Sequence, residues 1–204
     1  MTANVLAARS VALAVKEQAR YLGIDDAPFV FGDAETEVVG VVVRAPNYVE
    51  GAMTTRVAVD GRDATARLAA MIGASRFRDN LALVFLDGAA LGGFNVVDIA
   101  KLHEETGVPV ATVTRDEPDG VAIEKALRSR FEDADERLAV LRRQPLVEVA
   151  TAHKPLFVSC AGIGPRDVAD AISKCTVRGA LPEPIRIAHI VATAVKKGES
   201  HGRA

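Results

Sequence analysis

The sequence of 204 residues predicts an α/β fold, in which helices cover both faces of a mixed sheet. In its first third, a continuous β-branched run at Val38–Val43 and an alternating run at Met53–Asp60 flank a turn, which predicts antiparallel strands. Beyond Asp63, helical and strand patterns alternate, which predicts parallel strands joined by crossover helices. Hydrophobic residues make up 49% and charged residues 25%, a composition typical of globular proteins that excludes a disordered chain.

Length and charge narrow the class of protein further. We expect one domain over residues 1–204, since domains contain roughly 100–200 residues. The net charge of −2 excludes a global basic field, so any contact with nucleic acid has to come from a local basic stripe. No stretch approaches ~18 continuous apolar residues, and Cys160 and Cys175 are predicted to be core thiols. These features predict a cytoplasmic protein that has no contact with membranes.

The antiparallel part is expected to contain three strands. Arg20–Asp25 is a short apolar run that ends in two carboxylates, Asp25 and Asp26. Val38–Val43 is predicted to be a central strand, because a continuous β-branched run is typical of strands buried on both faces. The Pro, Asn and Gly of Ala45–Gly51 predict a hairpin tip, from which Met53–Asp60 returns as the third strand.

The alternating part continues to the end of the chain. Its expected elements are a helix capped by Asp63, a strand at Leu81–Leu86, a loop at Leu91–Asn95, a helix capped by Asn95 and ended by Gly107, a strand at Val108–Thr114, a charged helical region at Asp119–Arg143, a strand at Leu156–Cys160, a helix opened by Gly164 and Pro165, and a last helix at Pro182–Val195. By analogy, this order of elements is that of ribonuclease H-like folds.

Carboxylates lie where several of these elements begin or end. Asp25 and Asp26 close the first strand, Asp87 closes the fourth, and Asp60 and Asp63 flank the start of the first helix. If the first and fourth strands are adjacent and parallel, Asp25 and Asp87 lie side by side, at the edge where α/β proteins bind ligands. Crowded carboxylates favour a cation, and oxygen ligands suit Mg²⁺ or Mn²⁺. Taken singly, each of these residues also fits an ordinary turn or helix cap.

Several longer strings resemble one known family. They are LGIDD (Leu22–Asp26), VVVR (Val41–Arg44), VDGRDAT (Val59–Thr65), LDG (Leu86–Gly88), GGFNVVDI (Gly92–Ile99), TGVPV (Thr106–Val110) and RGALPEPIRIAHIVA (Arg178–Ala192). They look like the archaeal family catalogued as domain of unknown function ninety-nine, also called endonuclease dU. That family is similar to endonuclease V, a ribonuclease H-like nuclease that cuts DNA near deaminated bases. The resemblance covers about residues 16–197 and leaves short extensions at both ends.

The resemblance implies an activity. It predicts metal-dependent hydrolysis of a DNA phosphodiester next to deoxyuridine or another deaminated base, with Mg²⁺ or Mn²⁺ as cofactor. Two alternatives stay open: a catalytically weak protein of the same fold that binds nucleic acid or nucleotides, and an endonuclease that cuts RNA. The oligomeric state is left open.

The resemblance also assigns roles around the carboxylates. Asp25 and Asp87 take the places of the metal ligands on the first and fourth strands, and either Asp60 or Asp63 takes that of the ligand at the helix start. Asp26 is either a further ligand or a hydrogen-bond acceptor behind the ligands. His189 lies either beside the metals or in the core as a hydrogen-bonded histidine. Of the remaining candidates, Asp98 is favoured as an acid of the first helical turn rather than a site residue, His103 is placed on a polar helical face, His153 in a loop and His201 in the tail.

The remaining candidates would contact nucleic acid. The hairpin tip resembles the position of the wedge that separates the DNA strands in endonuclease V, and its Tyr48 would stack on an exposed base. The alternative is that Tyr48 packs on its own sheet. The Gly88–Asn95 loop resembles the segment that receives a flipped base, with Gly92 and Gly93 offering backbone amides and Asn95 reading a base edge. The alternative is a flexible connection. Arg44, Arg62 and Arg186 are the candidates for phosphate contacts, against a purely solvated role.

Overall fold

A computed structural model describes residues 18–30 and 32–200, so the predicted N-terminal extension and His201 lie outside the described residues. The strands are β1 (Arg20–Asp26), β2 (Glu35–Arg44), β3 (Tyr48–Ala58), β4 (Leu81–Asp87), β5 (Ala90–Leu91), β6 (Asn95–Val96), β7 (Val110–Thr114), β8 (Val147–Val149) and β9 (Leu156–Ala161). The α-helices are α1 (Ala64–Gly73), α2 (Ile99–Thr106), α3 (Gly120–Arg130), α4 (Ala134–Arg142), α5 (Pro165–Lys174) and α6 (Glu183–Lys197), and a 3₁₀ turn spans Arg78–Asn80.

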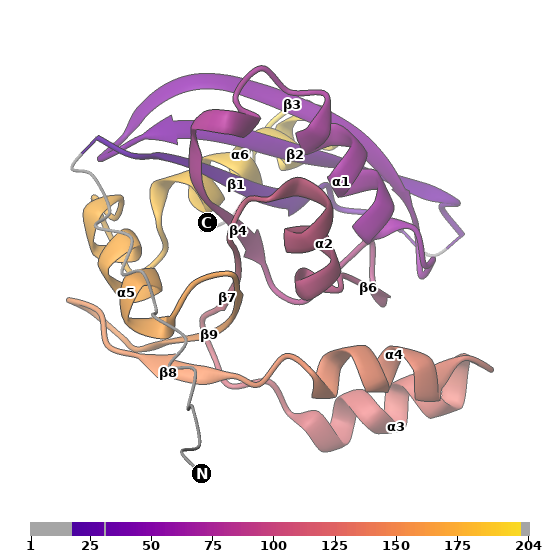
Figure 1. Cartoon of the computed structure of the whole chain (residues 1–204). Helices are drawn as coiled ribbons and strands as arrows, with labels where there is room; N and C mark the ends of the chain where they lie inside the picture. Colours follow the sequence, from indigo (N-terminus) through magenta and orange to yellow (C-terminus); the bar gives the residue numbers. More distant parts are fainter. Residues whose placement is uncertain (1–17, 31, 201–204) are drawn as a thin grey trace, which may run out of the picture.

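The predicted mixed sheet is confirmed. Its seven strands run in the order β3-β2-β1-β4-β7-β9-β8 (Figure 1). The pairs β1–β2 and β2–β3 are antiparallel, whereas β4 is parallel to both β1 and β7. Because Ile24 of β1 pairs with Leu86 of β4, the ends of these two strands are level. The two central strands therefore end side by side.

The sheet differs from the sequence prediction at its last two strands. The parallel strand expected at Leu156–Cys160 is β9, and it runs antiparallel to β7. The reason is β8, which pairs with β9 as an antiparallel neighbour and turns the chain around before β9 begins. β8 has three residues, of which Val147 and Glu148 are exposed. A strand this short and exposed has no alternating hydrophobic pattern by which the sequence could predict it.

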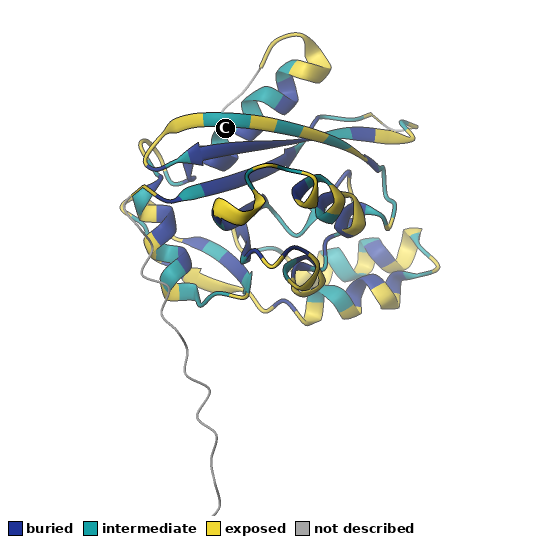
Figure 2. Ribbon diagram, turned by 45° about the horizontal axis from the view of Figure 1, so that its top comes forward, coloured by how far each residue is buried: buried dark blue, intermediate teal, exposed yellow. Residues whose placement is uncertain are grey.

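Helices cover both faces of the sheet, as predicted. On one face, α1 and α2 pack through Leu68, Ile72 and Leu102 on the strand residues Leu22 and Val84. On the other face, α5 and α6 cover a second set of strand residues, which includes Tyr21, Phe85, Ala111, Val39 and Val41. Figure 2 shows these inner strands as buried, while β3 alternates along the exposed edge of the sheet. Within the described ranges, no helix has the length and apolar character needed to cross a membrane.

Strand alternation decides which face each carboxylate meets. Successive side chains of a strand point to opposite faces. On β1, Leu22 and Ile24 belong to the core under α1 and α2, so Asp25 points to the face of α6 and Asp26 to the opposite face. On β4, Phe85 belongs to the core under α5 and α6, and Asp87 points the same way. Asp25 and Asp87 therefore share a face.

One helix start differs from the prediction. α2 begins at Ile99, and Asp98 is its N-cap, accepting a hydrogen bond from the amide of Lys101. Asn95 therefore does not cap this helix; instead, its Oδ1 accepts from the amide of Ala64 at the start of α1, at 3.0 Å. The charged helical region expected at Asp119–Arg143 forms two helices, α3 and α4, separated where Phe131 is extended.

Candidate metal centre

Three side chains gather at the carboxyl ends of β1 and β4. Asp25, Asp87 and His189 offer ligand atoms that all lie within 4.8 Å of one another. His189, on α6, brings its Nδ1 to 2.7 Å from Oδ2 of Asp25. The side chain of Asp25 is 9% exposed and that of His189 is 34% exposed. The cluster is thus sheltered on the side of Asp25 and open on the side of His189.

A glycine explains how α6 comes so close to β1. A Cβ atom built on Gly23 would lie 2.1 Å from the carbonyl carbon of Pro184 and 2.4 Å from the amide nitrogen of Ile185. Only a residue without a side chain permits this contact between backbones. Gly23 and Asp25 lie on the same face of β1, and His189 follows Ile185 by about one turn of α6. The glycine therefore sets the distance between Asp25 and His189.

The electrostatics of the cluster disfavour negative charge. Burial, followed by the charges of Asp87 and Asp26, raises the pKa of Asp25 to about 7, although the hydrogen bond from His189 acts in the opposite direction. Burial also raises the pKa of Asp87, against the attraction of Arg115 and His189. A buried carboxyl that holds a proton at neutral pH is one that a cation would stabilise in its charged form.

The residues fit a divalent cation. Two carboxylates supply the oxygen ligands that Mg²⁺ and Mn²⁺ prefer, and an imidazole nitrogen is a further ligand for a transition metal. Burial raises the pKa of both carboxyls, and the charges of Asp87 and Asp26 raise that of Asp25 further; a cation that replaces the protons offsets both effects. The donor set is therefore chemically suited to the cofactor expected from the sequence.

Asp26 supports the cluster from the other face of the sheet. Its Oδ2 accepts a hydrogen bond from the amide of Gly92, at 3.0 Å. Burial raises the pKa of Asp26, while the amide of Gly92 lowers it. The sequence leaves two roles for Asp26, a metal ligand or a hydrogen-bond acceptor behind the ligands. The structure favours the second role, because the side chain points away from His189 and holds the hairpin formed by β5 and β6.

Neither Asp60 nor Asp63 belongs to the cluster. Asp63 Oδ1 accepts from the amide of Ala58 and from Nδ2 of Asn95, and its Oδ2 pairs with Arg67. Asp60 Oδ1 accepts from the amide of Phe94, at 2.9 Å. The prediction that one of them is the third ligand is corrected: their oxygens hold loop backbone, and His189 is the third member of the group.

Asn95 is not available to read a base. It is fully buried, and its side chain bonds the amide of Ala64, the carbonyl of Ala58 and the carboxylate of Asp63. The expected role in base recognition is therefore wrong. From the sequence alone, an asparagine next to a glycine-rich turn that contacts a ligand cannot be told apart from one that caps a helix distant in the chain.

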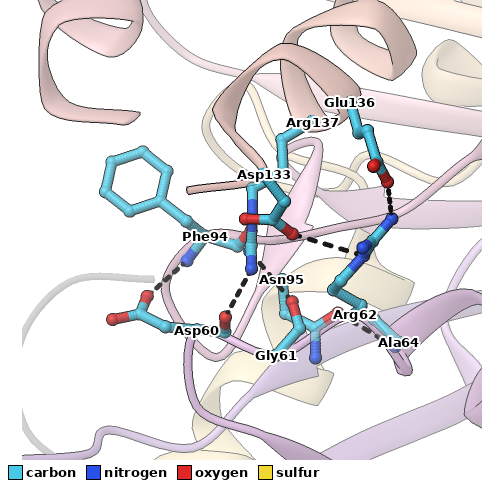
Figure 3. A network of polar contacts seen from close by, with 9 residues as sticks. All are labelled: Asp60, Gly61, Arg62, Ala64, Phe94, Asn95, Asp133, Glu136 and Arg137. Atoms are coloured by element: carbon cyan, nitrogen blue, oxygen red, sulfur yellow. Dashed lines mark hydrogen bonds and ion pairs between the residues drawn. The ribbon is translucent and has the colours of Figure 1, made fainter. Parts of the chain in front are cut away.

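Arg137 of α4 connects the hairpin formed by α3 and α4 to the loops around Asp60 and Phe94 (Figure 3). It is 7% exposed and donates to the backbone carbonyls of Asp60, Gly61 and Phe94, at 2.7–2.9 Å. Its Nε also pairs with Asp133, at 2.9 Å. One side chain thus ties together α4, the turn after β3 and the β5–β6 hairpin. The sequence gives no sign of this role, because Arg137 lies in a helix rich in charged residues.

The hairpin tip with Tyr48 lies far from the cluster. In the β1–β2 register, Arg44 stands opposite Arg20, at the other end of β1 from Asp25. Five residues of strand separate these ends, or roughly 17 Å at about 3.4 Å per residue. Tyr48 is exposed, at 67%, and pairs with Arg44. The wedge expected at Tyr48 is therefore misplaced. Each antiparallel turn brings the chain to the opposite end of the sheet, so the turn after β3, and not the β2–β3 turn, lies at the end of the sheet that holds the cluster.

The other candidates for contact with nucleic acid are engaged within the chain. Arg44 pairs with Glu50, Arg62 with Asp133 and Glu136, and Arg186 with Glu183. Gly92 and Gly93 have positive φ angles of 58° and 85° at the tip of the β5–β6 hairpin, and the amide of Gly92 is used by Asp26. The loop around them is thus a small structured hairpin rather than a flexible connection.

Three smaller expectations are resolved. Asp98 is a helix cap, as favoured, and does not point to the cluster. His103 is half-buried, with its Nδ1 at 2.9 Å from the carbonyl oxygen of Val108, and His153 lies exposed in a loop. Cys175 is buried and Cys160 is half-buried, and both are free thiols.

Comparison with known proteins decides the family. The family model described as Endonuclease dU matches residues 17–196. The chain belongs to the endonuclease dU family. A relative from Methanothermobacter thermautotrophicus, a UPF0215 protein, is 43% identical over 191 residues, which cover 93% of this chain and 94% of that protein. A relative from Methanopyrus kandleri is 45% identical over 189 residues, covering 91% and 95%.

Solved structures extend the comparison to the fold. A protein of unknown function from Archaeoglobus fulgidus is similar, with a TM-score of 0.80, 35% identity, and coverage of 91% of this chain and 100% of that chain. Endonuclease V from Ciona intestinalis, in complex with a DNA that contains an inosine followed by a ribo-adenosine, has a TM-score of 0.58 at 16% identity, covering 89% and 88%. This member of the endonuclease dU family thus has the ribonuclease H-like fold of endonuclease V, as expected.

Proposed function

We propose that the chain is a metal-dependent endonuclease that hydrolyses a DNA phosphodiester next to deoxyuridine or another deaminated base. The observation that supports this most strongly is the cluster of Asp25, Asp87 and His189. It lies at the carboxyl ends of adjacent parallel strands, where α/β proteins bind their ligands. The family description and the fold of endonuclease V point to the same chemistry.

The chain's own residues divide the work. Asp25, Asp87 and His189 would hold Mg²⁺ or Mn²⁺, with Asp25 kept in its charged form by the cation. A bound divalent cation supplies activation of water and stabilisation of charge on the leaving oxygen. His189 places its Nδ1 against Asp25, which orients the imidazole ring. Asp26 holds the amide of Gly92 and so keeps the β5–β6 hairpin beside the site.

The choice of substrate rests on the comparisons. The solved Ciona intestinalis endonuclease V is in complex with a DNA that contains an inosine followed by a ribo-adenosine, and the family description names dU. An RNA endonuclease and a binding protein with little turnover are the alternatives. The net charge of −2 and the ion-paired arginines favour contact with a short stretch of nucleic acid rather than with a long one.

A cleavage assay separates these alternatives. End-labelled DNA and RNA, each with one uracil, one hypoxanthine or no altered base, are incubated with the protein in Mg²⁺, Mn²⁺ or EDTA. We expect cutting of the deaminated DNA in either metal and none in EDTA. Asp87→Asn should remove the activity, whereas Asp79→Asn, which changes an exposed carboxylate just before β4, at the opposite end of that strand from Asp87, should keep it. Cutting of RNA alone, or binding without cutting, would contradict the proposal.

A further inference from the structure

The loop that follows β1 carries an exposed apolar side chain close to the metal cluster. β1 ends at Asp26, so this loop leaves the sheet at the end that holds the cluster. Within the loop, Val30 is 66% exposed, while Pro28 and Phe29 are half-buried. Val30 follows Asp26 by four residues, so their Cα atoms lie at most about 14 Å apart. A DNA strand held at the cluster would therefore pass near this side chain.

Polar contacts of the loop hold Val30 in this exposed position. The amide of Val30 donates to Oδ2 of Asp33, at 3.1 Å, and the amide of Asp33 donates to the carbonyl of Val30, at 3.0 Å. The same carboxylate pairs with Nζ of Lys196 on α6, at 2.9 Å. On the other side, the ring of Phe29 borders the β5–β6 hairpin, since a Cβ atom built on Gly93 would lie 3.5 Å from its Cζ. The turn is thus anchored to α6, while the side chain of Val30 stays in solvent.

The surroundings of Val30 distinguish it from other exposed apolar residues, which are common on protein surfaces and carry no meaning singly. The sequence from residue 27 to residue 32 contains no polar side chain, so the loop is apolar in sequence up to Asp33. By contrast, the turn after β3, at the same end of the sheet, is polar and contains Asp60, Arg62 and Asp63. The loop after β1 therefore presents an apolar surface beside the cluster.

Basic side chains stand next to this apolar loop. The last turn of α6 carries Lys196 and Lys197, both exposed, and Lys196 reaches the loop through Asp33. Phosphates on either side of a base step would meet these ammonium groups, while the bases would meet Val30. An apolar side chain between a metal centre and two lysines fits a stack of bases flanked by phosphates better than it fits an apolar protein surface.

We propose that the loop after β1 inserts the side chain of Val30 between two bases of duplex DNA beside the cut. This inference rests on the proposed function and adds to it the surface that opens the duplex. A base that is read outside the duplex has to leave the stack, which costs free energy. An apolar side chain that enters the vacated step offsets this cost, because it buries its own surface against the neighbouring bases. At about 3.4 Å per nucleotide along a strand, the reach of about 14 Å places the inserted step within roughly four nucleotides of the end of β1.

Substitution of Val30 should separate the duplex from the single strand. Single-turnover rates are measured in Mg²⁺, at saturating protein, on duplex and on single-stranded DNA that contain one deoxyuridine. In Val30→Ser, we expect the ratio of the duplex rate to the single-strand rate to fall about tenfold, or about 1.4 kcal/mol, because a single strand has little stacking to open. Val30→Leu should keep the ratio, because it keeps an apolar side chain. Val121→Ser, which changes an 81% exposed valine on α3, is the matched control and should also keep it.

Fluorescence reads the insertion without cutting. A duplex with 2-aminopurine next to the deoxyuridine is titrated with protein in EDTA, and binding is followed in parallel by the anisotropy of a dye at the end of the duplex. Unstacking raises the fluorescence of 2-aminopurine, so we expect bound wild type and bound Val121→Ser to raise it and bound Val30→Ser to leave it low.

Several results would overturn the inference: an equal rise with wild type and Val30→Ser, no binding or no rise with the wild type, or an unchanged ratio of rates in Val30→Ser. An unchanged ratio in a protein that cuts leaves the proposed function standing. A rise that depends on Val30 in a protein that does not cut supports the insertion and contradicts the activity.

Discussion

The carboxyl of Asp25 contributes to how the stability of the protein without metal responds to pH, as do Asp26 and Asp87, whose pKa values are also raised. The pKa of Asp25 in the folded chain is about 7, against 3.8 for an ordinary aspartate. The folded state therefore binds a proton more tightly than the unfolded state, and the free energy of unfolding falls as pH rises from about 4 to about 7. Above that range the loss is complete. Burial and the charges of Asp87 and Asp26 are the causes.

Asp25→Asn should remove its part of this pH dependence, because asparagine stays neutral. In EDTA, we expect the variant to be more stable than the wild type at pH 8, by up to a few kcal/mol at about 1.4 kcal/mol per pKa unit. At pH 4 the two should differ little. Thermal midpoints measured between pH 4 and pH 8 test this, with Asp79→Asn, which changes a 90% exposed carboxylate, as the control. A stability difference that stays constant across this range would contradict the burial of charge at Asp25.

Single residues also show what the sequence can and cannot predict. Asp25 and Asp87 were predictable, because each ends a strong apolar strand and the strand order places the two ends together. Asn95, Asp60 and Asp63 were misassigned, because their partners lie in other loops and at helix starts brought together only by the fold. Gly23, a glycine inside an apolar strand, does carry a signal for close backbone approach.

At the scale of elements, the contact between β1 and α6 positions the candidate site. The helix supplies His189, and the strand supplies Asp25 and the gap at Gly23 that admits Pro184. Ala188 and Ala192, both fully buried, let the rest of α6 lie close to β2. The spacing of helix and strand is thus encoded in small residues rather than in polar contacts.

Gly23→Ala should therefore weaken both the fold and the site. The added Cβ would lie 2.1 Å from the backbone of Pro184, so α6 has to move away. We expect a loss of about 1–3 kcal/mol or more in urea unfolding, typical of overpacking, together with weaker binding of Mn²⁺. Gly73→Ala is the matched control, because its Cβ meets nothing within 4 Å and alanine favours a helix. A Gly23→Ala protein with unchanged stability and metal affinity would contradict this account of α6.

For the tip of the β2–β3 hairpin, we predict that a substitution has no effect on the choice between duplex and single-stranded DNA. Its tip lies at the other end of β1 from Asp25, and Tyr48 is exposed. Tyr48→Ala should therefore leave unchanged the ratio of single-turnover rates on duplex and single-stranded deoxyuridine DNA. Stability should change by no more than about 0.5 kcal/mol, as at other exposed sites. A tenfold fall on duplex DNA alone would show that the tip acts at the cut after all.

At the scale of the whole molecule, Arg137 joins the α3–α4 hairpin to the two loops beside the site. Removing it leaves the carbonyls of Asp60, Gly61 and Phe94 without this donor. We expect Arg137→Met to cost about 3 kcal/mol in urea unfolding and to speed hydrogen exchange at the amide of Phe94. Arg137→Lys should recover part of the loss. Arg128→Met, which removes exposed ion pairs with Glu124 and Asp135, should cost far less stability than Arg137→Met, and an equal cost for the two methionine variants would argue against this tie.

The overall architecture was the most predictable level. Continuous apolar runs and helical periods located the main strands and the helix-forming regions, and the order of elements predicted the mixed sheet. The direction of β9 was missed, because it depends on β8, three residues without a hydrophobic period. The same holds for the break between α3 and α4, where a charged, weakly patterned sequence hides the turn at Phe131.

We expect Asp25, Asp87 and His189 to hold a divalent cation, and binding of Mn²⁺ followed by electron paramagnetic resonance measures this. The wild type should bind Mn²⁺, and Asp87→Asn and His189→Ala should each bind at least about tenfold more weakly, since even residues behind metal ligands contribute about 10–100-fold. Asp60→Asn, which lies outside the cluster, should bind as the wild type does. A wild type that does not bind Mn²⁺, or an Asp60→Asn variant that loses binding while Asp87→Asn keeps it, would contradict the account.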